Sequence, residues 1–401
     1  MVINSLFVAA LLAVAASGQG LLLTGVGAGP PAAGGACGTG YLHCRQLTID
    51  HTKVPNTDQS NFPVLLSATI VDWADSGHGG DVQNTVTQSG GQAITIPADW
   101  IISTAANCGS PITSWEFETY TNTSGAVNVW FKVTTVSHTS DTILYVCDDK
   151  ASVSTQQGTV SSTWDSNYLI VWHLADGATN TTVVDSTSNA NNGTNASNTS
   201  TKTVTGQIDG ALTYAGTATE QTTLASATAL NAYPITVELW CKYALSHSDV
   251  GGIFTKYTGN SLAGWSIHTN GGHTYAWYFK DSSNDVYPGG DGIDFGAGLN
   301  DSAWHHYAFV VDSGGGHIYL DGTVVGSATA WTGTAGATTS TELVRIADLN
   351  GLGGGFLSEA NEVAQADEAR LSQSARSADW VKTEYNNQNS PSTFITIGGR
   401  S

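Results

Sequence analysis

Short runs of alternating hydrophobic and polar residues occupy most of the chain after residue 44. Successive side chains of a β-strand point to opposite faces, so a period of two predicts strands with one buried face. Five such runs, separated by turn residues, are RQLTIDHTKV, FPVLLSATIV, SWEFETYTN, AVNVWFKVTTV and DTILYVCDD. Their spacing predicts a first β-sandwich over residues 45–150.

A polar stretch over residues 151–166 predicts a linker, and a second set of short strands follows it. The strands of residues 167–372 are rich in Trp and Tyr and are separated by glycine turns, which predicts a second β-sandwich. The segments DSGGGH and LDGT in this part are hairpin signals. Residues 373–401 contain a helical pattern, SARSADWVKTEYNNQ, with Ser377 as its candidate N-cap.

The composition supports an all-β fold and restricts the possible partners. Only 11% of the 401 residues are charged, and 46 are Gly. The 33 Asp and Glu outnumber the 13 Lys and Arg, which gives a formal net charge of −20. Such a surface repels nucleic acids and anionic membranes. We therefore expect no nucleic-acid partner.

Residues 1–44 differ from the rest of the chain. They begin with an apolar run, LFVAALLAVAA at residues 6–16, and continue with the Gly- and Pro-rich GVGAGPPAAGGACGTG, which is typical of a linker. The apolar run lacks the basic residues of a secretion signal, since the first charged residue is Arg45. It is also too short to span a bilayer, so we expect no stable membrane span.

Two interpretations of this apolar N-terminal arm remain open. In one, the arm is a weak secretion signal that is cut at AVAASGQ. In the other it is retained as a strand buried on both faces, because both alternate sets of its residues are apolar. A retained strand needs a groove in a neighbouring subunit, which strand addition supplies. Self-assembly would then depend on Val2, Ile3, Leu6, Phe7, Val8, Leu11 and Leu12.

The chain contains five cysteines, none of them in a CxxC metal-binding pattern. Cys241 lies in the alternating strand TVELWCKY, which favours a buried free thiol. The other four allow three pairings, and the sequence cannot choose among them. Our working hypothesis pairs Cys37 with Cys44 and Cys108 with Cys147. Disulfides at these positions would indicate an oxidising compartment, and hence an extracellular or cell-surface protein.

Several of these motifs resemble those of two known families. Residues 47–149, with LTIDHTKVPNTDQSNFPVLL, WEFETY, VWFKV and SDTILYV, resemble a bacterial domain of unknown function that precedes lectin-like modules. Residues 168–372, with VVDSTSNANNGT, GQIDGALTYAG, WHHYAFVVD and IYLDGTVVG, resemble a laminin-G-like, concanavalin A-type jelly roll. The resemblance implies two sandwiches of jelly-roll type. It leaves the function open, because this fold carries lectins, adhesins and glycosidases.

The resemblance also implies a calcium site at the rim of the jelly roll. Ca²⁺ prefers oxygen ligands. Asp185 and Asp367 are therefore the best candidate ligands, and Asn189 is a weaker candidate. The alternative is that these side chains cap turns. We expect no other cofactor.

Two tryptophans near Gly-rich loops, Trp265 and Trp277, are candidates for glycan binding, with core packing as the alternative. Sequons for N-linked glycans mark residues that would be exposed on a secreted protein. They occur at Asn122, Asn180, Asn192, Asn195, Asn198 and Asn300.

Glu116 and Glu118 in WEFETY are the nearest match to the paired carboxylates of a retaining glycosidase. They lie in the first sandwich rather than in the lectin-like unit, and we expect no enzymatic activity. The favoured hypothesis is an extracellular structural protein, a filament subunit assembled head to tail through the N-terminal arm. The alternative is a secreted carbohydrate-binding adhesin with a cleaved signal, and a glycosidase is least favoured.

Overall fold

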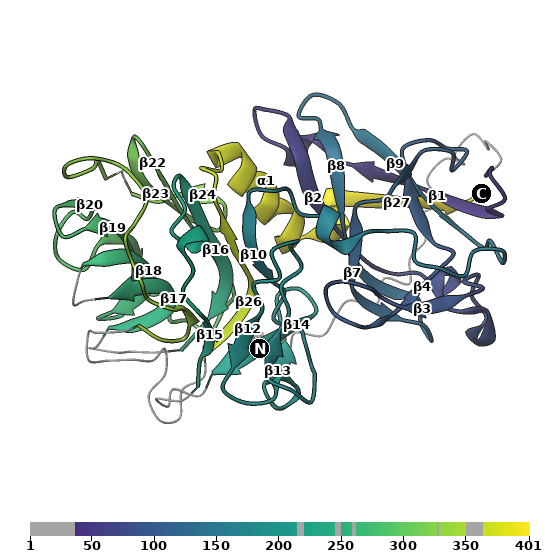
Figure 1. Ribbon diagram of the computed structural model, residues 1–401. Coiled ribbons are helices and arrows are strands. Elements are labelled where there is room, and N and C mark those ends of the chain that lie inside the picture. Colours follow the sequence, from purple (N-terminus) through teal and green to yellow (C-terminus); the bar gives the residue numbers. More distant parts are fainter. Residues whose placement is uncertain (1–36, 215–219, 245–249, 259–261, 327–328, 350–363) are drawn as a thin grey trace, which may run out of the picture.

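The computed structural model describes residues 37–214, 220–244, 250–258, 262–326, 329–349 and 364–401. Strands dominate these residues and form two sandwiches side by side, with helix α1 (Ala378–Asn389) between them (Figure 1). The fold class is therefore all-β, as predicted. The N-terminal arm, with its candidate self-assembly residues, lies outside the described residues. Within the described part of the chain, no helix is long and apolar enough to cross a membrane.

The first sandwich contains a five-stranded sheet of order β27-β1-β9-β5-β6 and a three-stranded sheet of order β2-β8-β7. A two-stranded sheet, β3-β4, accompanies them. The strands are β1 (His43–Ile49), β2 (Gln59–Thr69), β3 (Thr85–Thr87), β4 (Thr95–Pro97), β5 (Ile101–Ser103), β6 (Pro111–Ile112), β7 (Trp115–Thr121), β8 (Ala126–Val136), β9 (Thr142–Asp148) and β27 (Ile395–Arg400). Short 3₁₀ helices connect them: η1 (His51–Lys53), η2 (Val71–Trp73), η3 (Ser76–His78) and η4 (Val160–Ser162).

The end of the chain belongs to the first sandwich, which differs from the predicted domain boundaries. After α1 and the short helix α2 (Pro391–Phe394), strand β27 pairs antiparallel with β1. Phe394 and Ile395 are buried in the hydrophobic core of this sandwich. Residues 373–401 are thus not a separate tail, because their apolar side chains complete a core that residues 45–150 leave open.

The second sandwich is larger. Its eight-stranded sheet has the order β13-β14-β26-β16-β22-β23-β24, with β10 paired to β26. These strands are β10 (Tyr168–Trp172), β13 (Thr203–Thr205), β14 (Gly210–Tyr214), β16 (Ile235–Lys242), β22 (His305–Asp312), β23 (Gly315–Leu320), β24 (Thr323–Val324) and β26 (Ala364–Ser372). The predicted LDGT turn joins β23 to β24, where Asp321 and Gly322 both have positive φ, as a tight hairpin turn requires.

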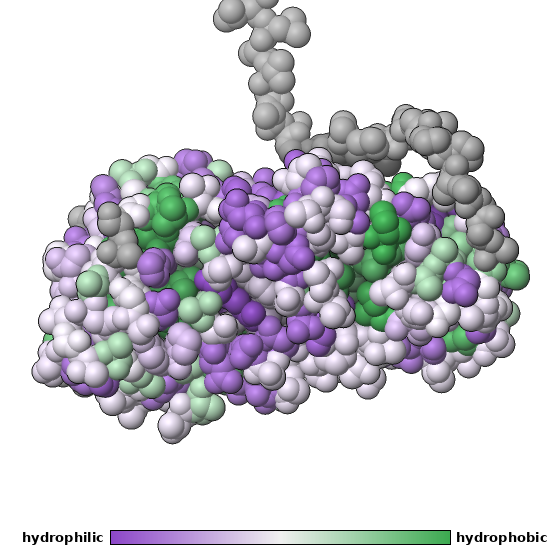
Figure 2. Space-filling view, turned by 90° about the horizontal axis from the view of Figure 1, so that it is seen from above, coloured by the Kyte–Doolittle hydropathy of each residue, from purple (hydrophilic) through white to green (hydrophobic). Residues whose placement is uncertain are grey.

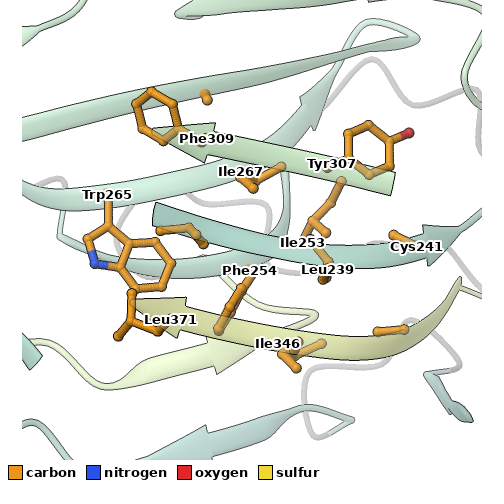
Figure 3. Close-up of a cluster of buried hydrophobic side chains, with 14 of the residues drawn as sticks. Leu239, Cys241, Ile253, Phe254, Trp265, Ile267, Tyr307, Phe309, Ile346 and Leu371 are labelled. Atoms are coloured by element: carbon orange, nitrogen blue, oxygen red, sulfur yellow. The ribbon is translucent and has the colours of Figure 1, made fainter. Parts of the chain in front are cut away.

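The facing sheet has nine strands in the order β11-β12-β15-β25-β17-β18-β19-β20, with β21 paired to β19. They are β11 (Thr182–Val183), β12 (Gly193–Asn195), β15 (Thr222–Leu224), β17 (Gly251–Thr258), β18 (Ala263–Asn270), β19 (His273–Asp281), β20 (Asn284–Val286), β21 (Ile293–Ala297) and β25 (Val344–Ile346). Two 3₁₀ helices, η5 (Thr199–Thr201) and η6 (Thr228–Leu230), lie in the connections. The main hydrophobic core fills the space between the two sheets (Figure 3).

Helix α1 contacts both sandwiches. Trp380 packs edge-on against Phe62 of the first sandwich, with ring centroids 4.8 Å apart. Val381 packs instead against Val310 and Tyr319 of the second. Ser377 caps the helix as predicted, because its hydroxyl accepts a hydrogen bond from the backbone N–H of Trp380. The helix therefore joins the two units rather than following them.

Two disulfides stabilise the first sandwich, and they are those of the working hypothesis. One joins Cys37 to Cys44 and the other joins Cys108 to Cys147. Cys241 is a buried free cysteine, also as predicted, and its side chain lies in the core of the second sandwich (Figure 3). On the face shown in Figure 2, hydrophobic residues appear only in small separate areas, and hydrophilic residues cover the middle of the molecule.

Candidate functional site

The outer face of the nine-stranded sheet carries a row of aromatic side chains. Along β19, Ala276 and Tyr278 lie in the core, so the alternate residues Tyr275, Trp277 and Phe279 lie on the opposite face. On that face the Trp277 ring lies 5.0 Å from Tyr257 of β17 and 6.2 Å from Tyr287, measured between ring centroids. Strand alternation thus places one set of aromatic residues in the core and a second set outside it.

These outer aromatic side chains line a pocket of about 450 Å³. The described residues that form it are Val250, Tyr257, Leu262, Trp277, Phe279, Ser282, Asp285, Tyr287, Gly290 and Asp291. Its volume and its mainly apolar lining with a few polar groups are typical of small-ligand sites. We call it the aromatic pocket.

His268 of β18 lies beside the aromatic pocket and is uncharged at neutral pH. Its ring centroid is 3.8 Å from that of Trp277. Its Nε2 lies 3.0 Å from the backbone oxygen of Asp291, and because a carbonyl only accepts, Nε2 carries the proton. Burial lowers the pKa of His268 to about 3. The described lining contains two Asp and neither Lys nor Arg, so the pocket is acidic.

The indole N–H of Trp277 has no hydrogen-bond partner among the described residues. Leaving such a buried donor unpaired costs about 1–3 kcal/mol. A ligand that presents a hydroxyl or carbonyl oxygen to this group would recover that free energy.

The two tryptophans predicted to bind glycans have different environments. Trp277 lines the aromatic pocket, although its side chain is only 6% exposed. Trp265 is fully buried and packs edge-on against Phe254 in the core, with centroids 5.1 Å apart (Figure 3). The prediction for Trp265 is therefore wrong, because its strand turns that side chain toward the facing sheet. Tyr257, Phe279 and Asp285 were not predicted. The alternation of aromatic residues in TYAWYF, residues 274–279, was a usable signal for Phe279 alone.

The candidate calcium ligands do not converge on one site in the described structure. Asp185 is buried, and its Oδ1 accepts hydrogen bonds from the backbone N–H groups of Val171 at 2.9 Å and Thr187 at 3.1 Å. Its Oδ2 accepts from the Thr187 hydroxyl and from the backbone N–H of Asn191. Asn189 is exposed, and its amide donates to the Thr187 hydroxyl. These are the turn-capping contacts that were the alternative.

Asp367 belongs to a buried cluster between the two sandwiches. Glu116 and Glu118 of β7 meet His173 and Glu368 of the second sandwich there, and each of these five residues is at most 2% exposed. The Nδ1 atom of His173 lies 2.7 Å from Glu368 Oε1, and its Nε2 lies 3.5 Å from Glu116 Oε2. The Glu116–Glu118 pair is therefore part of the contact between the units, with no access for a substrate.

Arg370 provides positive charge beside this interdomain cluster. One guanidinium nitrogen lies 2.5 Å from Glu368, and another pairs with Glu384 of α1. The guanidinium also lies over the rings of Trp130 and Trp164, 4.6 and 4.9 Å from their centroids. Several partners of this kind are needed to offset the cost of removing a charge from water.

Three members of the interdomain cluster hold protons more tightly than usual. Burial raises the pKa of Glu118 and of Asp367 well above their usual values, and the charge of Glu368 adds to this. Burial alone would lower the pKa of His173, but Glu368, Glu116 and Glu118 raise it well above normal. All three groups therefore bind protons more tightly in the fold than in the unfolded chain. Their contribution to stability is lost as pH rises through the folded pKa values.

The sequons differ in accessibility. Asn195 is buried, and its side-chain amide donates to the backbone oxygen of Ser197 at 3.0 Å. A glycan on this nitrogen is incompatible with the fold, which corrects the prediction for this residue. The other sequon residues are exposed (Asn180, Asn192 and Asn198) or half-buried (Asn122 and Asn300).

Comparison with protein families gives a match for residues 215–382, to a family described as the concanavalin A-like lectin/glucanases superfamily. The match covers most of the second sandwich, which is therefore similar to a concanavalin A-like domain. The residues that line the aromatic pocket all lie within the matched range of this domain. The resemblance of residues 47–149 to a domain of unknown function stays a prediction. A search of curated proteins finds no match.

Solved structures similar to this chain include binding domains of Paraclostridial Mosquitocidal Protein 1 and of botulinum neurotoxins. The binding domain of Paraclostridial Mosquitocidal Protein 1 is 12% identical, with a TM-score of 0.42, over 55% of this chain and 52% of that one. A structure concerning the interaction of botulinum neurotoxin type C with two ganglioside molecules is 10% identical, with a TM-score of 0.41, over 55% and 51%. The chain thus spans about half the length of these structures. A likeness at this level carries no information on ligands.

Proposed function

We propose that this protein is a non-enzymatic glycan-binding protein, and that the aromatic pocket of the concanavalin A-like domain holds the glycan. The observation that carries the proposal is the grouping of Tyr257, Trp277, Phe279 and Tyr287 around one cavity with two carboxylates. Core packing does not require this grouping, because these side chains lie outside the main core.

A sugar ring matches this environment in two ways. Its C–H face packs against aromatic rings, and Tyr and Trp combine such an apolar surface with a polar group. Its hydroxyl groups donate to carboxylates, which Asp285 and Asp291 supply at the pocket. A sugar oxygen would also accept a hydrogen bond from the unpaired indole N–H of Trp277.

An extracellular or cell-surface location agrees with this function. The two disulfides of the first sandwich persist in oxidising compartments. Glycans of cell surfaces and extracellular matrices are therefore the partners that we propose for the pocket.

Binding of the full-length protein to a panel of glycans, followed by calorimetry with the best ligand, tests this function. We expect Tyr287→Ala to weaken binding at least tenfold, which is about 1.4 kcal/mol. Trp277→Phe keeps an aromatic ring but removes the N–H and part of the ring surface, and we expect a smaller loss. Trp304→Ala is the control, since Trp304 is a half-buried tryptophan beside Lys242 on the other sheet. Absence of binding to every glycan, or binding that Tyr287→Ala leaves unchanged, would contradict the proposal.

A second candidate function is a filament subunit, and its support is the sequence of the N-terminal arm. An apolar segment without charged residues would be buried in a neighbouring subunit by strand addition. Electron microscopy of the native protein and of a variant lacking residues 1–20 tests it. Filaments that disappear on deletion support the proposal, and monomers in both samples contradict it.

A further inference from the structure

A group of ionisable side chains lies at the edge of the first sandwich where β1, β9 and the C-terminus meet (Figure 1). His43 at the start of β1 is directly opposite Asp148 at the end of β9. The Nδ1 atom of His43 lies 3.9 Å from Asp148 Oδ1, 3.2 Å from Asp149 Oδ2 and 3.5 Å from Asp81 Oδ2. Three carboxylates and one imidazole from three segments therefore surround one small volume.

The distances from His43 Nδ1 to the three carboxylates fit a coordination shell. In a tetrahedral site with bonds of about 2.1 Å, neighbouring ligand atoms are about 3.4 Å apart. The three distances from His43 Nδ1, from 3.2 to 3.9 Å, lie around that value. The ligand atoms of His43, Asp81 and Asp149 also lie within 4.8 Å of one another.

One of the carboxylate oxygens lacks a hydrogen-bond donor. Asp148 Oδ1 is buried and has no hydrogen-bond partner among the described residues, whereas Asp81 Oδ2 forms an ion pair with Arg400. Asp148 as a whole is 2% exposed, so water does not replace the missing donor. A bound cation would satisfy this oxygen.

We propose that His43, Asp81, Asp148 and Asp149 form a binding site for a divalent transition-metal ion, with Zn²⁺ as the best match. One imidazole nitrogen with three carboxylate oxygens is a ligand set that Zn²⁺ accepts in tetrahedral geometry. The imidazole nitrogen makes Ca²⁺ and Mg²⁺ poorer matches, because these ions prefer oxygen ligands.

The surroundings hold these ligands in place. Cys44 follows His43 and Cys147 precedes Asp148, and both cysteines form disulfides. Adjacent residues of a strand point to opposite faces, so the disulfides fix the backbone from the other side of the sheet. The side chain of Gln83 donates to Asp149 Oδ1 at 2.9 Å, which orients the other oxygen of Asp149 toward His43.

Arg400 is the competitor of the metal at this site. One guanidinium nitrogen lies 2.9 Å from Asp81 Oδ2 and another 3.2 Å from His43 Nδ1. Its side chain is 37% exposed and belongs to the edge strand β27, so it can turn toward solvent. The other nearby cation, Arg45, pairs with Asp72, which also lies 3.7 Å from Arg400. Metal binding would thus exchange one cation for another, and removal of Arg400 should strengthen it.

Calorimetric titration of the full-length protein with Zn²⁺ at neutral pH tests the proposal. We expect one site in the wild type and at least tenfold weaker binding in the isosteric variant Asp148→Asn and in His43→Gln. Arg400→Gln should bind more tightly than the wild type. His51→Gln is the matched control, because His51 lies with Asp50 and Asp141 in a more exposed group of one imidazole and two carboxylates.

A second readout separates a metal site from adventitious surface binding. Co²⁺ in place of Zn²⁺ should give the visible absorption of a tetrahedral centre in the wild type and not in Asp148→Asn. The far-ultraviolet circular dichroism of each variant shows whether it is folded. Absence of Zn²⁺ binding at about 1 mM metal, a range of negligible affinity, would overturn the proposal. Binding that both ligand variants retain would mean an adventitious ion only, with the same consequence.

Discussion

The contribution of β27 to the first sandwich leads to a quantitative prediction for Phe394→Ala. Phe394 is fully buried in the core of that sandwich and precedes the strand that pairs with β1. Removing a buried Phe side chain loses its transfer free energy and leaves a cavity, which together typically cost about 3–5 kcal/mol. We expect the free energy of unfolding to fall by about this amount, a large part of the stability of an ordinary domain.

Urea unfolding followed by tryptophan fluorescence measures this loss, because the first sandwich contains Trp73, Trp100, Trp115 and Trp130. The urea concentration at the midpoint of unfolding should fall. The slope of the free energy of unfolding against urea concentration should stay unchanged, as expected when only stability changes. Thr396→Ala is the control, since Thr396 is exposed on the same strand, and it should cost less than about 0.5 kcal/mol. If Phe394→Ala were as mild as Thr396→Ala, residues 391–401 would be an appended tail and our description of the first core would be wrong.

Two further predictions concern stability. Raising the pH from about 6.5 to 8 should lower the free energy of unfolding, because Glu118, Asp367 and His173 hold protons that the unfolded chain has released wholly or in part by the lower of these pH values. Burial lowers the pKa values of His268 and His306, so these two groups make the free energy of unfolding rise with pH. They do so mainly at lower pH, where the unfolded chain binds protons at these histidines. Urea unfolding at both pH values should show a smaller loss in Glu118→Gln, and an equal loss would exclude Glu118 as a cause. Replacing both Cys108 and Cys147 by Ser should cost about 4 kcal/mol, against about 2 for Cys37 and Cys44, because loop-closure entropy grows with the 39- and 7-residue separations. Equal losses in thermal unfolding would contradict this estimate.

Local features were predictable because they depend on neighbouring residues. Ser377 caps α1 through a hydrogen bond to a residue three positions away, and LDGT forms a hairpin turn from its own backbone preferences. Alternation likewise located the five longest strands of the first sandwich, β1, β2, β7, β8 and β9. These features require no knowledge of what packs against them.

Features that depend on distant contacts were not predictable. Both faces of β19 are apolar, so alternation separated Trp277 from Tyr278 without showing which of them faces the core. Glu116 and Glu118 share one face of β7, and both contact His173 of the second sandwich, which no local pattern shows. The aromatic pocket therefore required the structure, although its aromatic residues stand out in the sequence. The pairing of β27 with β1 joins opposite ends of the described chain, which no local pattern reveals.

That pairing has a consequence for synthesis of the protein. A ribosome delivers residues in order, and β1 emerges long before Ile395 and the five residues that follow it. A nascent chain that ends at Ser390 already contains all of the second sandwich, yet one edge of its first sheet is still unpaired. The first unit to be made is therefore the last to be finished, since β1 stays without this partner strand until Ile395–Arg400 have been made.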